Sequence, residues 1–273
     1  MNSVAAHDRA AESLLAFWAE AGVDAMLLDE PVDRVAEGRI APPPAPTPIT
    51  APRRPAFGAV AATVDVAAPL AEARRAAAAA QDVEALAVAI AAFEGCGLRF
   101  EGAASRSVFS RGRADAPLMV IGEGPGADED AQGEPFVGRA GKLLDKMLAG
   151  AAIADRVFIT NTVFWRPPGN RTPTPAEQLI CAPFVERAIQ LVAPRMLLLL
   201  GGAAAKFMLK RDEGILSLRG RWLEWKSEDG ELEIPALPTL HPAFLLRQPA
   251  AKKRAWGDLL TLVERLDRPD RPA

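Results

Sequence analysis

Four short, mostly apolar runs recur along the second half of the chain, at residues 118–121, 157–160, 196–200 and 236–240. Segments with helical spacing of apolar residues accompany them, at 140–148, 175–192, 203–210 and 250–266. Buried strands that alternate with helices are typical of a parallel sheet covered on both faces. The pattern predicts an α/β fold, a three-layer α/β/α sandwich around a mostly parallel, four-stranded sheet.

The N-terminal part of the chain has a different composition. Apolar residues at helical spacing between about Arg9 and Leu28 predict an amphipathic helix. Residues 41–52 contain prolines too closely spaced for helix or sheet, which predicts a linker. An alanine-rich stretch from Asp65 to Phe93 predicts helix again. We therefore divide the chain into an N-terminal helical segment (1–38), a proline-rich linker (39–64) and an α/β/α domain (65–273).

Each predicted strand ends at a glycine-rich or polar position. These endings are Gly122-Glu-Gly-Pro-Gly126, Asn161, Gly201-Gly202 and His241-Pro242. The carboxyl ends of parallel strands lie along one sheet edge, where open α/β folds bind ligands, so the four endings should line one crevice. A dinucleotide is not the expected ligand, because Pro125 and the acidic residues after it would repel a pyrophosphate.

Composition narrows the classes of function. A chain of 273 residues with 49% hydrophobic residues can bury a large core, and a net charge of -3 argues against a polybasic binder while leaving room for a local basic face. The chain lacks an apolar stretch of membrane-spanning length and the residue order of a signal peptide, so we expect a cytoplasmic protein without membrane contact. The absence of tyrosine excludes mechanisms that need a phenol.

Asn161 and His241 are candidate chemical groups at the predicted ligand edge. His241 is one of two histidines, with His7 in the N-terminal segment, and Pro242 restricts its backbone. A neutral imidazole there could donate a hydrogen bond to charge that develops on an oxygen. The amide of Asn161 matches the O4 and N3–H edge of uracil or thymine, but capping a strand end would explain it as well.

Phe136 and a group of carboxylates lie in the loop after the first predicted strand. Phe136 is either a buried core residue or a platform on which a ring stacks. The carboxylates are Glu123, Asp128, Glu129 and Asp130. One carboxylate near a sugar could orient water and stabilise an oxocarbenium-like centre, whereas the others would be solvated loop or helix N-terminal charges.

Basic residues gather on segments attached to the same sheet edge. They are Arg166, Arg171, Arg219, Arg221, Arg247, Lys252, Lys253 and Arg254. Each alone is an ordinary surface charge. Together, on a slightly acidic protein, they favour contacts to phosphates.

These features resemble the family 4 uracil-DNA glycosylases, from about Gly95 to the last helix. The matching stretches are residues 122–130, 133–145, Asn161, 166–175, 218–222 and 239–249. The resemblance implies an enzyme that flips uracil out of single- or double-stranded DNA and hydrolyses its N-glycosidic bond, which initiates base excision repair. It also implies a protein that acts as a monomer.

The resemblance also assigns roles. Glu123 and Gly124 would form the water-side wall of the pocket, and Gly124 would leave room for base and water where better-known uracil glycosylases carry an aspartate. Phe136 would stack on uracil, Asn161 would read the edge of the base, and His241 would donate a hydrogen bond to uracil O2. Glu129 matches an acidic residue of the family to which no exact role is assigned. Leu245 and Leu246 would form the wedge that enters the base stack. Contacts to DNA fall to Arg166, Arg171, Arg219, Arg221 and Arg247.

One departure from the family concerns its iron–sulfur cluster, which four cysteines usually hold. Cys96 and Cys181 match two of those positions, but Phe93 and Trp165 stand at the other two. Two thiolates are too few for the usual ligation. We expect no cofactor, and we expect Phe93 and Trp165 to pack in the volume that the cluster would fill.

Other functions remain open at this point. A non-catalytic nucleic-acid-binding relative, or one that acts on other deaminated bases, would share the same motifs. Relatives that trap DNA covalently carry a basic, histidine-containing insertion after the second strand, and this chain has none between Asn161 and Pro175. A nucleotide-phosphate hydrolase would need a metal-binding cluster that the sequence does not show.

Overall fold

The computed structural model describes residues 66–101 and 103–268. The chain divides into two units, Met1–Ala61 and Ala62–Ala273, and the described residues belong to the second. The predicted N-terminal helical segment (1–38) and linker (39–64) lie outside the described residues, as does His7.

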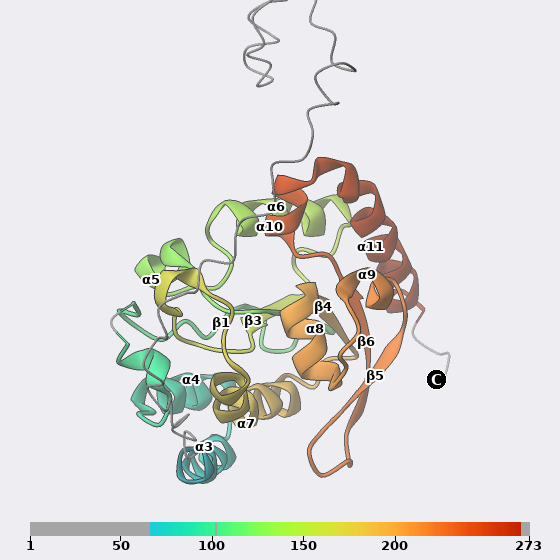
Figure 1. Ribbon diagram of the computed structural model, residues 1–273. Helices are drawn as coiled ribbons and strands as arrows, with labels where there is room; N and C mark the ends of the chain where they lie inside the picture. Colours follow the sequence, from blue (N-terminus) through green and yellow to red (C-terminus); the bar gives the residue numbers. More distant parts are fainter. Residues whose placement is uncertain (1–65, 102, 269–273) are drawn as a thin grey trace, which may run out of the picture. The chain divides into compact units, whose positions relative to one another are not determined.

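A six-stranded sheet in the order β1-β3-β2-β4-β6-β5 forms the centre of the described unit (Figure 1). Its four inner strands are parallel, as predicted: β3 (Val157–Asn161), β2 (Leu118–Gly122), β4 (Met196–Leu200) and β6 (Glu233–Thr239). The edge strands β1 (Ser110–Gly112) and β5 (Leu223–Lys226) pair antiparallel with their neighbours. Both edge strands are short and partly exposed, so apolar runs did not reveal them.

Helices cover both faces of the sheet, which confirms the three-layer prediction. On β2, Met119 and Ile121 join one core and Leu118 and Val120 the other, because successive side chains of a strand point to opposite faces. The first core also contains buried residues of α3 (Ala67–Ala79), α4 (Val83–Ala92), α7 (Pro175–Val192) and α8 (Gly201–Leu209). The second contains residues of α6 (Arg139–Gly150) and α11 (Lys252–Leu266).

The carboxyl edge of the sheet gathers the strand endings. Gly122 and Asn161 are register partners at the ends of β2 and β3. His241 follows β6 directly and is the N-cap of α10 (Pro242–Arg247). The remaining short elements are η1 (Gly97–Arg99), α5 (Ala127–Gln132), η2 (Pro168–Asn170), α9 (Ile215–Leu218) and η3 (Pro249–Ala251).

Among the described residues, every helix is too short or too polar to traverse a lipid bilayer.

Candidate active site

A pocket of about 540 Å³ opens at the carboxyl edge of the sheet. It is lined by residues from four of the segments that the sequence singled out. Among them are Glu123, Gly124, Glu129, Phe136, Asn161, Arg171, His241 and Arg247. The predicted base-binding and catalytic residues, which are scattered over more than a hundred positions, therefore share one cavity.

Asn161 places an unpaired polar atom against this pocket. Its side chain is 1% exposed, and its Oδ1 has no hydrogen-bond partner in the described part of the chain. A Cβ on Gly122 would lie 2.4 Å from Cζ of Phe136 and 2.5 Å from Oδ1 of Asn161, so ring and amide lie beside the same glycine. An orphaned buried acceptor costs about 1–3 kcal/mol, and a ligand donor would remove that cost. The atom is therefore placed to bind a ligand.

Phe136 lines the pocket from a strained backbone position. Its φ is 58°, in the left-handed region that large side chains avoid, and its side chain is 6% exposed. Its ring centroid lies 5.7 Å from that of His241, with an angle of 33° between the rings. Such strain persists only where surrounding contacts hold it, and it is common at ligand sites.

Three residues hold the Phe136 turn. Glu129 Oε1 accepts hydrogen bonds from the N–H groups of Val137 and Gly138, both at 3.0 Å, and its Oε2 accepts the N–H of Gly126 at 3.1 Å. These bonds occupy the Glu129 carboxylate with backbone donors. The structure thus favours a positioning role for Glu129 over the catalytic role considered from the sequence.

Arg111 and Gly141 complete this support, and neither was singled out by sequence reasoning. Arg111 Nε donates to the carbonyl of Pro135 at 2.8 Å, and its Nη2 donates to the carbonyl of Phe136 at 3.3 Å. A Cβ on Gly141 would lie 1.6 Å from the Phe136 carbonyl oxygen. The only signal in the sequence was a glycine in the first turn of a predicted helix, where glycine lowers helix propensity.

His241 is held as a neutral imidazole. Burial lowers its pKa to about 4, the charge of Arg247 adds to this effect, and Glu129 opposes it. Its Nδ1 accepts the backbone N–H of Ala243 at 3.1 Å, so the neutral ring carries its proton on Nε2. Gly201 has a φ of +88°, and a Cβ there would lie 2.9 Å from Cβ of His241. The ring is therefore oriented, and it offers one N–H donor at neutral pH.

Glu123 contributes a carboxylate that lines the pocket. Its carbonyl accepts a hydrogen bond from Thr162 Oγ1 at 2.6 Å, and that hydroxyl accepts one from Gln178 Nε2 at 3.1 Å. The backbone of Glu123 is thus anchored, while no hydrogen bond or ion pair of its carboxylate occurs among the described residues. This carboxylate is the one in the pocket best placed to act on water.

Gly124 has a packing reason for being glycine that differs from the expected one. A Cβ there would lie 2.9 Å from Cγ2 of Val163 and 3.6 Å from Cγ of Pro173. The missing side chain would therefore point at the pocket wall and collide with Val163. Close packing of Gly124 against the Val163 side chain thus favours glycine here, and the expected role of Gly124 in leaving room for base and water stays a prediction.

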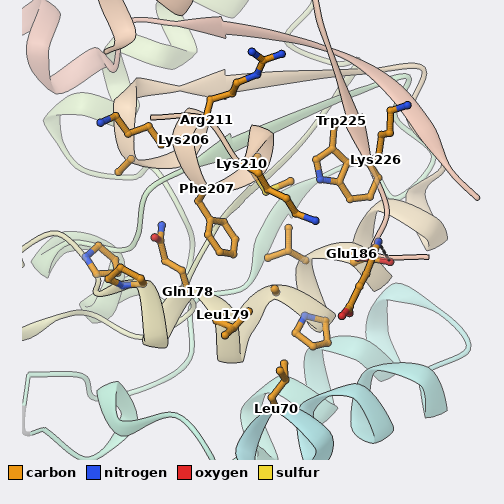
Figure 2. Close-up of a pocket in the computed structure, with 18 of the residues that line it drawn as sticks. Leu70, Gln178, Leu179, Glu186, Lys206, Phe207, Lys210, Arg211, Trp225 and Lys226 are labelled. Atoms are coloured by element: carbon orange, nitrogen blue, oxygen red, sulfur yellow. Dashed lines mark hydrogen bonds between the residues drawn. The ribbon is translucent and has the colours of Figure 1, made fainter. Parts of the chain in front are cut away.

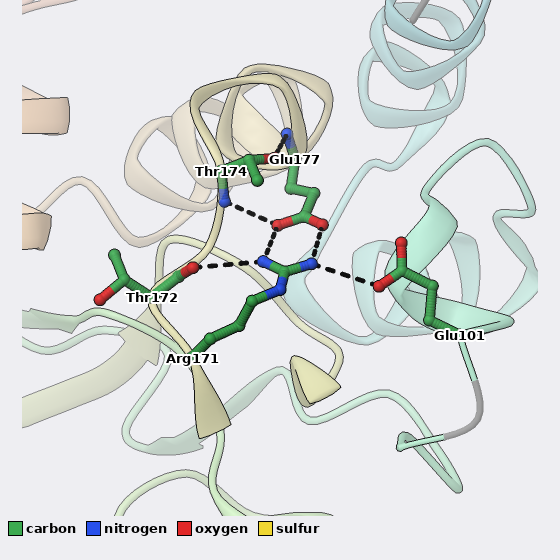
Figure 3. A network of polar contacts seen from close by, with 5 residues as sticks. All are labelled: Glu101, Arg171, Thr172, Thr174 and Glu177. Atoms are coloured by element: carbon green, nitrogen blue, oxygen red, sulfur yellow. Dashed lines mark hydrogen bonds and ion pairs between the residues drawn. The ribbon is translucent and has the colours of Figure 1, made fainter. Parts of the chain in front are cut away.

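Arg171 holds the loop that walls the pocket (Figure 3). It forms a two-pronged ion pair with Glu177, with Nη1–Oε2 at 2.9 Å and Nη2–Oε1 at 2.6 Å, and it reaches Glu101 at 3.2 Å. Thr174 and Glu177 also form the capping box of α7. Burial opposes the charge of Glu177, but Arg171 and the N–H of Thr174 outweigh it and lower its pKa. The guanidinium is occupied by carboxylates, although a phosphate contact was expected.

Arg219 has a similar internal role. Its guanidinium forms a buried ion pair with Asp258, which also accepts a hydrogen bond from Thr239 Oγ1 at 2.6 Å. Thr239 is the last residue of β6 and lies two positions before His241. Arg219 thus supports the strand that presents the histidine, and the Arg219 side chain is only 20% exposed. The ion pair with Asp258 therefore favours a structural role for Arg219 over the phosphate contact expected from the sequence.

The α10 helix separates the two leucines expected to wedge into DNA. Leu245 is fully buried against Leu240 and Ala255, whereas Leu246 is 37% exposed. Adjacent helix positions face different directions, so only one of the two can point outward. The wedge role expected for both residues is therefore corrected to Leu246 alone.

The other predicted basic contacts remain at the surface. Arg247 is exposed and lines the pocket. Arg166 donates through Nε to Asn170 Oδ1 at 2.7 Å, which orders the loop, and Arg221 lies 3.7 Å from Glu213 with its side chain 55% exposed. These arginines are free enough to reach a phosphate.

Two of the four residues at the iron–sulfur positions, Phe93 and Trp165, have side chains that cannot ligate a metal. Cys96 and Cys181 are fully buried free thiols. Burial raises the pKa of Cys181 well above its usual range, whereas the hydrogen bond with Cys181 lowers the pKa of Cys96. Phe93 and Trp165 pack with Phe164 and Phe184 in what we call the aromatic cluster. In the described part of the chain, no group of three or more potential metal-ligating side chains occurs.

A larger hollow, of about 680 Å³, lies between α7, α8 and β5 (Figure 2). Leu179 and Phe207 give it an apolar floor, and Lys206 and Arg211 lie at its rim. It adjoins the first pocket at Thr172 and Pro173. Asn161, Phe136 and His241 do not line it, so the chemistry belongs to the smaller pocket.

Comparison with known proteins agrees with this geometry. The model of the Uracil DNA glycosylase superfamily matches residues 109–260. A type-4 uracil-DNA glycosylase of Thermotoga maritima is 40% identical over 142 residues, which cover 51% of this chain and 71% of the relative. That of Sulfurisphaera tokodaii is 37% identical over 166 residues (59% and 74%), and that of Saccharolobus solfataricus is 37% identical over 167 residues (59% and 76%).

Proposed function

This chain belongs to the uracil-DNA glycosylase superfamily and acts as a uracil-DNA glycosylase, and on that premise we propose how its pocket selects and releases uracil. The observation that carries the proposal is the orphaned Oδ1 of Asn161, buried beside the ring of Phe136. A flipped base that stacks on this ring brings its polar edge to the amide.

Asn161 selects uracil by its pattern of donors and acceptors. Its Oδ1 accepts N3–H of uracil, and its Nδ2 donates to O4. Cytosine presents an acceptor at N3 and a donor at C4, so it would leave both amide atoms wrongly paired. A site built to make such hydrogen bonds rejects a mismatched analogue strongly, because its buried groups stay unsatisfied.

His241 stabilises the leaving uracil. As the glycosidic bond breaks, negative charge develops on the base, and the Nε2–H of the neutral ring donates to O2. A pKa of about 4 keeps the ring neutral at pH 7, so no proton is transferred in the ground state. The tilted contact between the Phe136 and His241 rings supports this role, because a base stacked on Phe136 would lie close to the donor.

Glu123 acts on the sugar side. Its carboxylate orients a water molecule and stabilises the oxocarbenium-like centre that remains when the C1′–N1 bond breaks. The water oxygen then bonds to C1′, Glu123 accepts the proton that the water gives up, and the uracil anion takes up a proton from solvent after it leaves. Glu129 acts through the backbone, by holding the turn that presents Phe136. The flip itself costs a few kcal/mol, and Leu246 together with phosphate contacts of Arg166, Arg221 and Arg247 offsets it.

The finer properties expected from the sequence are part of the proposal. We propose that the protein acts as a monomer on single- or double-stranded DNA, because one chain supplies the whole pocket. A cytoplasmic location is supported only by the need to reach DNA. We also propose that the aromatic cluster replaces the iron–sulfur cluster of the family, since its four rings occupy the core beside Cys96 and Cys181.

An oligonucleotide assay tests the proposed function. A labelled strand with one uracil is incubated with the protein in EDTA and then treated with alkali, and scission at the uracil is expected. The Asn161→Asp variant should lose uracil excision while it keeps DNA affinity. Full excision by that variant would refute the amide assignment.

The proposed absence of a cluster has its own test. Protein purified without oxygen is assayed for iron and for acid-labile sulfide, and both should be far below one equivalent. Stoichiometric iron and sulfide would refute this part of the proposal while leaving the glycosylase assignment intact.

A further inference from the structure

A second, smaller hollow lies on the other side of α10 from the uracil pocket. Its volume is about 370 Å³, near the lower end of the range for small-molecule sites, which is about 300–1,000 Å³. Leu143 and Met147 of α6, Leu245 of α10 and Trp256 of α11 give it apolar walls. Trp256 is 38% exposed, which is unusual for the largest apolar side chain.

The rim of this hollow is basic. Lys146, Lys252 and Lys253 line it, and within the described ranges none of them forms an ion pair. Arg139, Lys142 and Lys146 follow one another on α6 at spacings of three and then four residues, which places all three on one helix face.

Carboxylates do not neutralise this face. Asp145, the acidic residue adjacent to Lys146, pairs with Arg111 at 2.5 Å. Gln248 and Pro249, which join α10 to the α11 side of the rim, carry no charge. A cationic surface therefore surrounds an apolar hollow, and it suits a ligand with a flat apolar part and negative charges.

The hollow and the uracil pocket are lined by different residues of the same two helices, α6 and α10. On α6, Ala140 lines the uracil pocket and Met147 lines the hollow, a separation of about 10 Å at 1.5 Å per residue. On α10, Arg247 lines the uracil pocket and Leu245 the hollow, with the exposed Leu246 between them in sequence. A DNA strand with uracil in the pocket would thus pass the hollow within one or two nucleotides.

We propose that this hollow is a second nucleotide subsite, which takes an unpaired base of the uracil-bearing strand next to or one position removed from the flipped uracil. The base stacks on Trp256, and its phosphates lie against Lys146, Lys252 and Lys253. Stacking on an aromatic ring combined with a basic track is the general mode of single-strand binding. The inference rests on the proposed glycosylase function and adds a preference for unpaired flanking bases.

An acidic peptide would match the charge of the rim equally well. The position of the hollow beside the uracil pocket favours DNA, because α6 and α10 contribute residues to both cavities. A base that is paired in a duplex could not enter the hollow, so the subsite would act mainly on single strands.

Abasic substitution along the DNA tests the subsite. Single-stranded oligonucleotides with one uracil carry a single abasic spacer at each of the three flanking positions on either side, and KM and kcat are measured. In the wild-type protein, one position within two nucleotides of uracil should raise KM about tenfold. Trp256→Leu keeps an apolar side chain but removes the ring, so this position-specific effect should disappear, and Trp256→Phe should restore most of it.

Two matched controls separate the subsite from general effects. Leu260→Ala truncates another exposed apolar residue one turn further along α11, and Lys206→Ala removes a lysine on the distant α8. Both should retain the wild-type spacer profile. A flat profile in the wild type, or an unchanged profile in Trp256→Leu, would overturn the proposal.

Salt dependence and strand pairing complete the test. Lys252→Ala combined with Lys253→Ala should lower the slope of log K against log salt by about 1.4 on single strands. Hybridising the complementary strand should abolish the effect of Trp256→Leu on KM. If the wild-type protein bound an acidic peptide more tightly than the single strand, the assignment of the hollow to DNA would be refuted. Uracil excision from a short oligonucleotide should persist in Leu260→Ala and Lys206→Ala. A wild-type protein that excises no uracil from it would count against the proposed function and not against the subsite.

Discussion

The uracil pocket and the aromatic cluster belong to the same domain, but their side chains differ in how well they are packed and hydrogen-bonded. The pocket keeps a buried amide oxygen that has no hydrogen-bond partner within the described ranges, and a phenylalanine at a φ of 58°. In the aromatic cluster, Phe93 is 3% exposed and Phe184 is fully buried, with ring centroids 5.1 Å apart in an edge-to-face contact. One region stores unfavourable free energy, and the other provides the packing that offsets it.

This difference indicates where function and stability can be separated. Groups left unsatisfied in the folded protein are available to a ligand, so changing them should affect activity more than folding. Groups that are packed and satisfied should show the reverse.

Asn161→Leu should give the largest effect on activity. The change removes the amide that reads the base, so kcat/KM for uracil excision should fall about 10³-fold. Removing an orphaned buried acceptor with little change of shape should leave the thermal midpoint unchanged or higher. Single-turnover excision and thermal unfolding measure the two effects.

Asn170→Asp is the matched control, because Asn170 lines the same pocket but keeps an acceptor for Arg166 after the change. It should retain excision within a few-fold. A loss of several degrees in Asn161→Leu would show that the amide is needed for folding, and the comparison between the two regions would fail.

Phe93→Ala should show the opposite pattern. Truncating a buried aromatic residue costs about 3–5 kcal/mol of unfolding free energy, because transfer and cavity effects add. Excision per folded molecule at low temperature should stay within about threefold of the wild type, because Phe93 does not line the pocket. Phe100→Ala, at a side chain 61% exposed, is the control and should change stability by less than about 0.5 kcal/mol.

Protonation of His241 should make both the stability and the activity of the protein depend on pH. The unfolded histidine titrates near 6.5 and the folded one near 4, so protonation favours the unfolded state. Its stabilising effect is full above pH 6.5 and is lost as pH falls to 4, by about 3 kcal/mol in total. Urea unfolding at pH 7.5 and 4.5 should show this loss in the wild type and a smaller one in His241→Gln.

The pH profile of activity checks the same residue independently. With a folded pKa of about 4, kcat/KM should remain nearly constant from pH 7.5 to 5.5 and decline only near pH 4. An inflection near 6.5 would mean that the ring is solvated, and the assignment of a buried neutral donor would then be wrong.

The inner sheet was predictable because β2, β3 and β4 are buried along their whole length and β6 over its last four residues, so that each carries a mostly apolar run. The edge strands were not, because β5 alternates exposed and buried residues and β1 spans only Ser110–Gly112. Likewise, Pro175–Val192 was predicted with the observed bounds, since Thr174, Pro175 and Glu177 form a recognisable helix start.

Within the site, sequence identified the residue types at strand ends but not their partners. Which arginines are free depends on contacts across the fold, such as Arg219 with Asp258 or Arg171 with Glu101, and no local pattern reports these pairs. The orientation of Leu245 and Leu246 could have been inferred from helix geometry once α10 was recognised. The support of Phe136 by Arg111 is visible only in three dimensions.

Arg171→Ala should give the smallest effect and should decide between two roles for this arginine. If it only positions the loop, kcat/KM should fall about tenfold, Glu177→Gln should give a similar loss, and the dependence of DNA binding on salt should not change. If it contacts a phosphate, the slope of log K against log salt should fall by about 0.7–0.9, while Glu177→Gln should bind DNA as well as the wild type. We expect the first outcome, because Glu177 and Glu101 already occupy the guanidinium. Fluorescence-anisotropy titrations at several salt concentrations, with Arg247→Ala as a control that does lower the slope, distinguish the two.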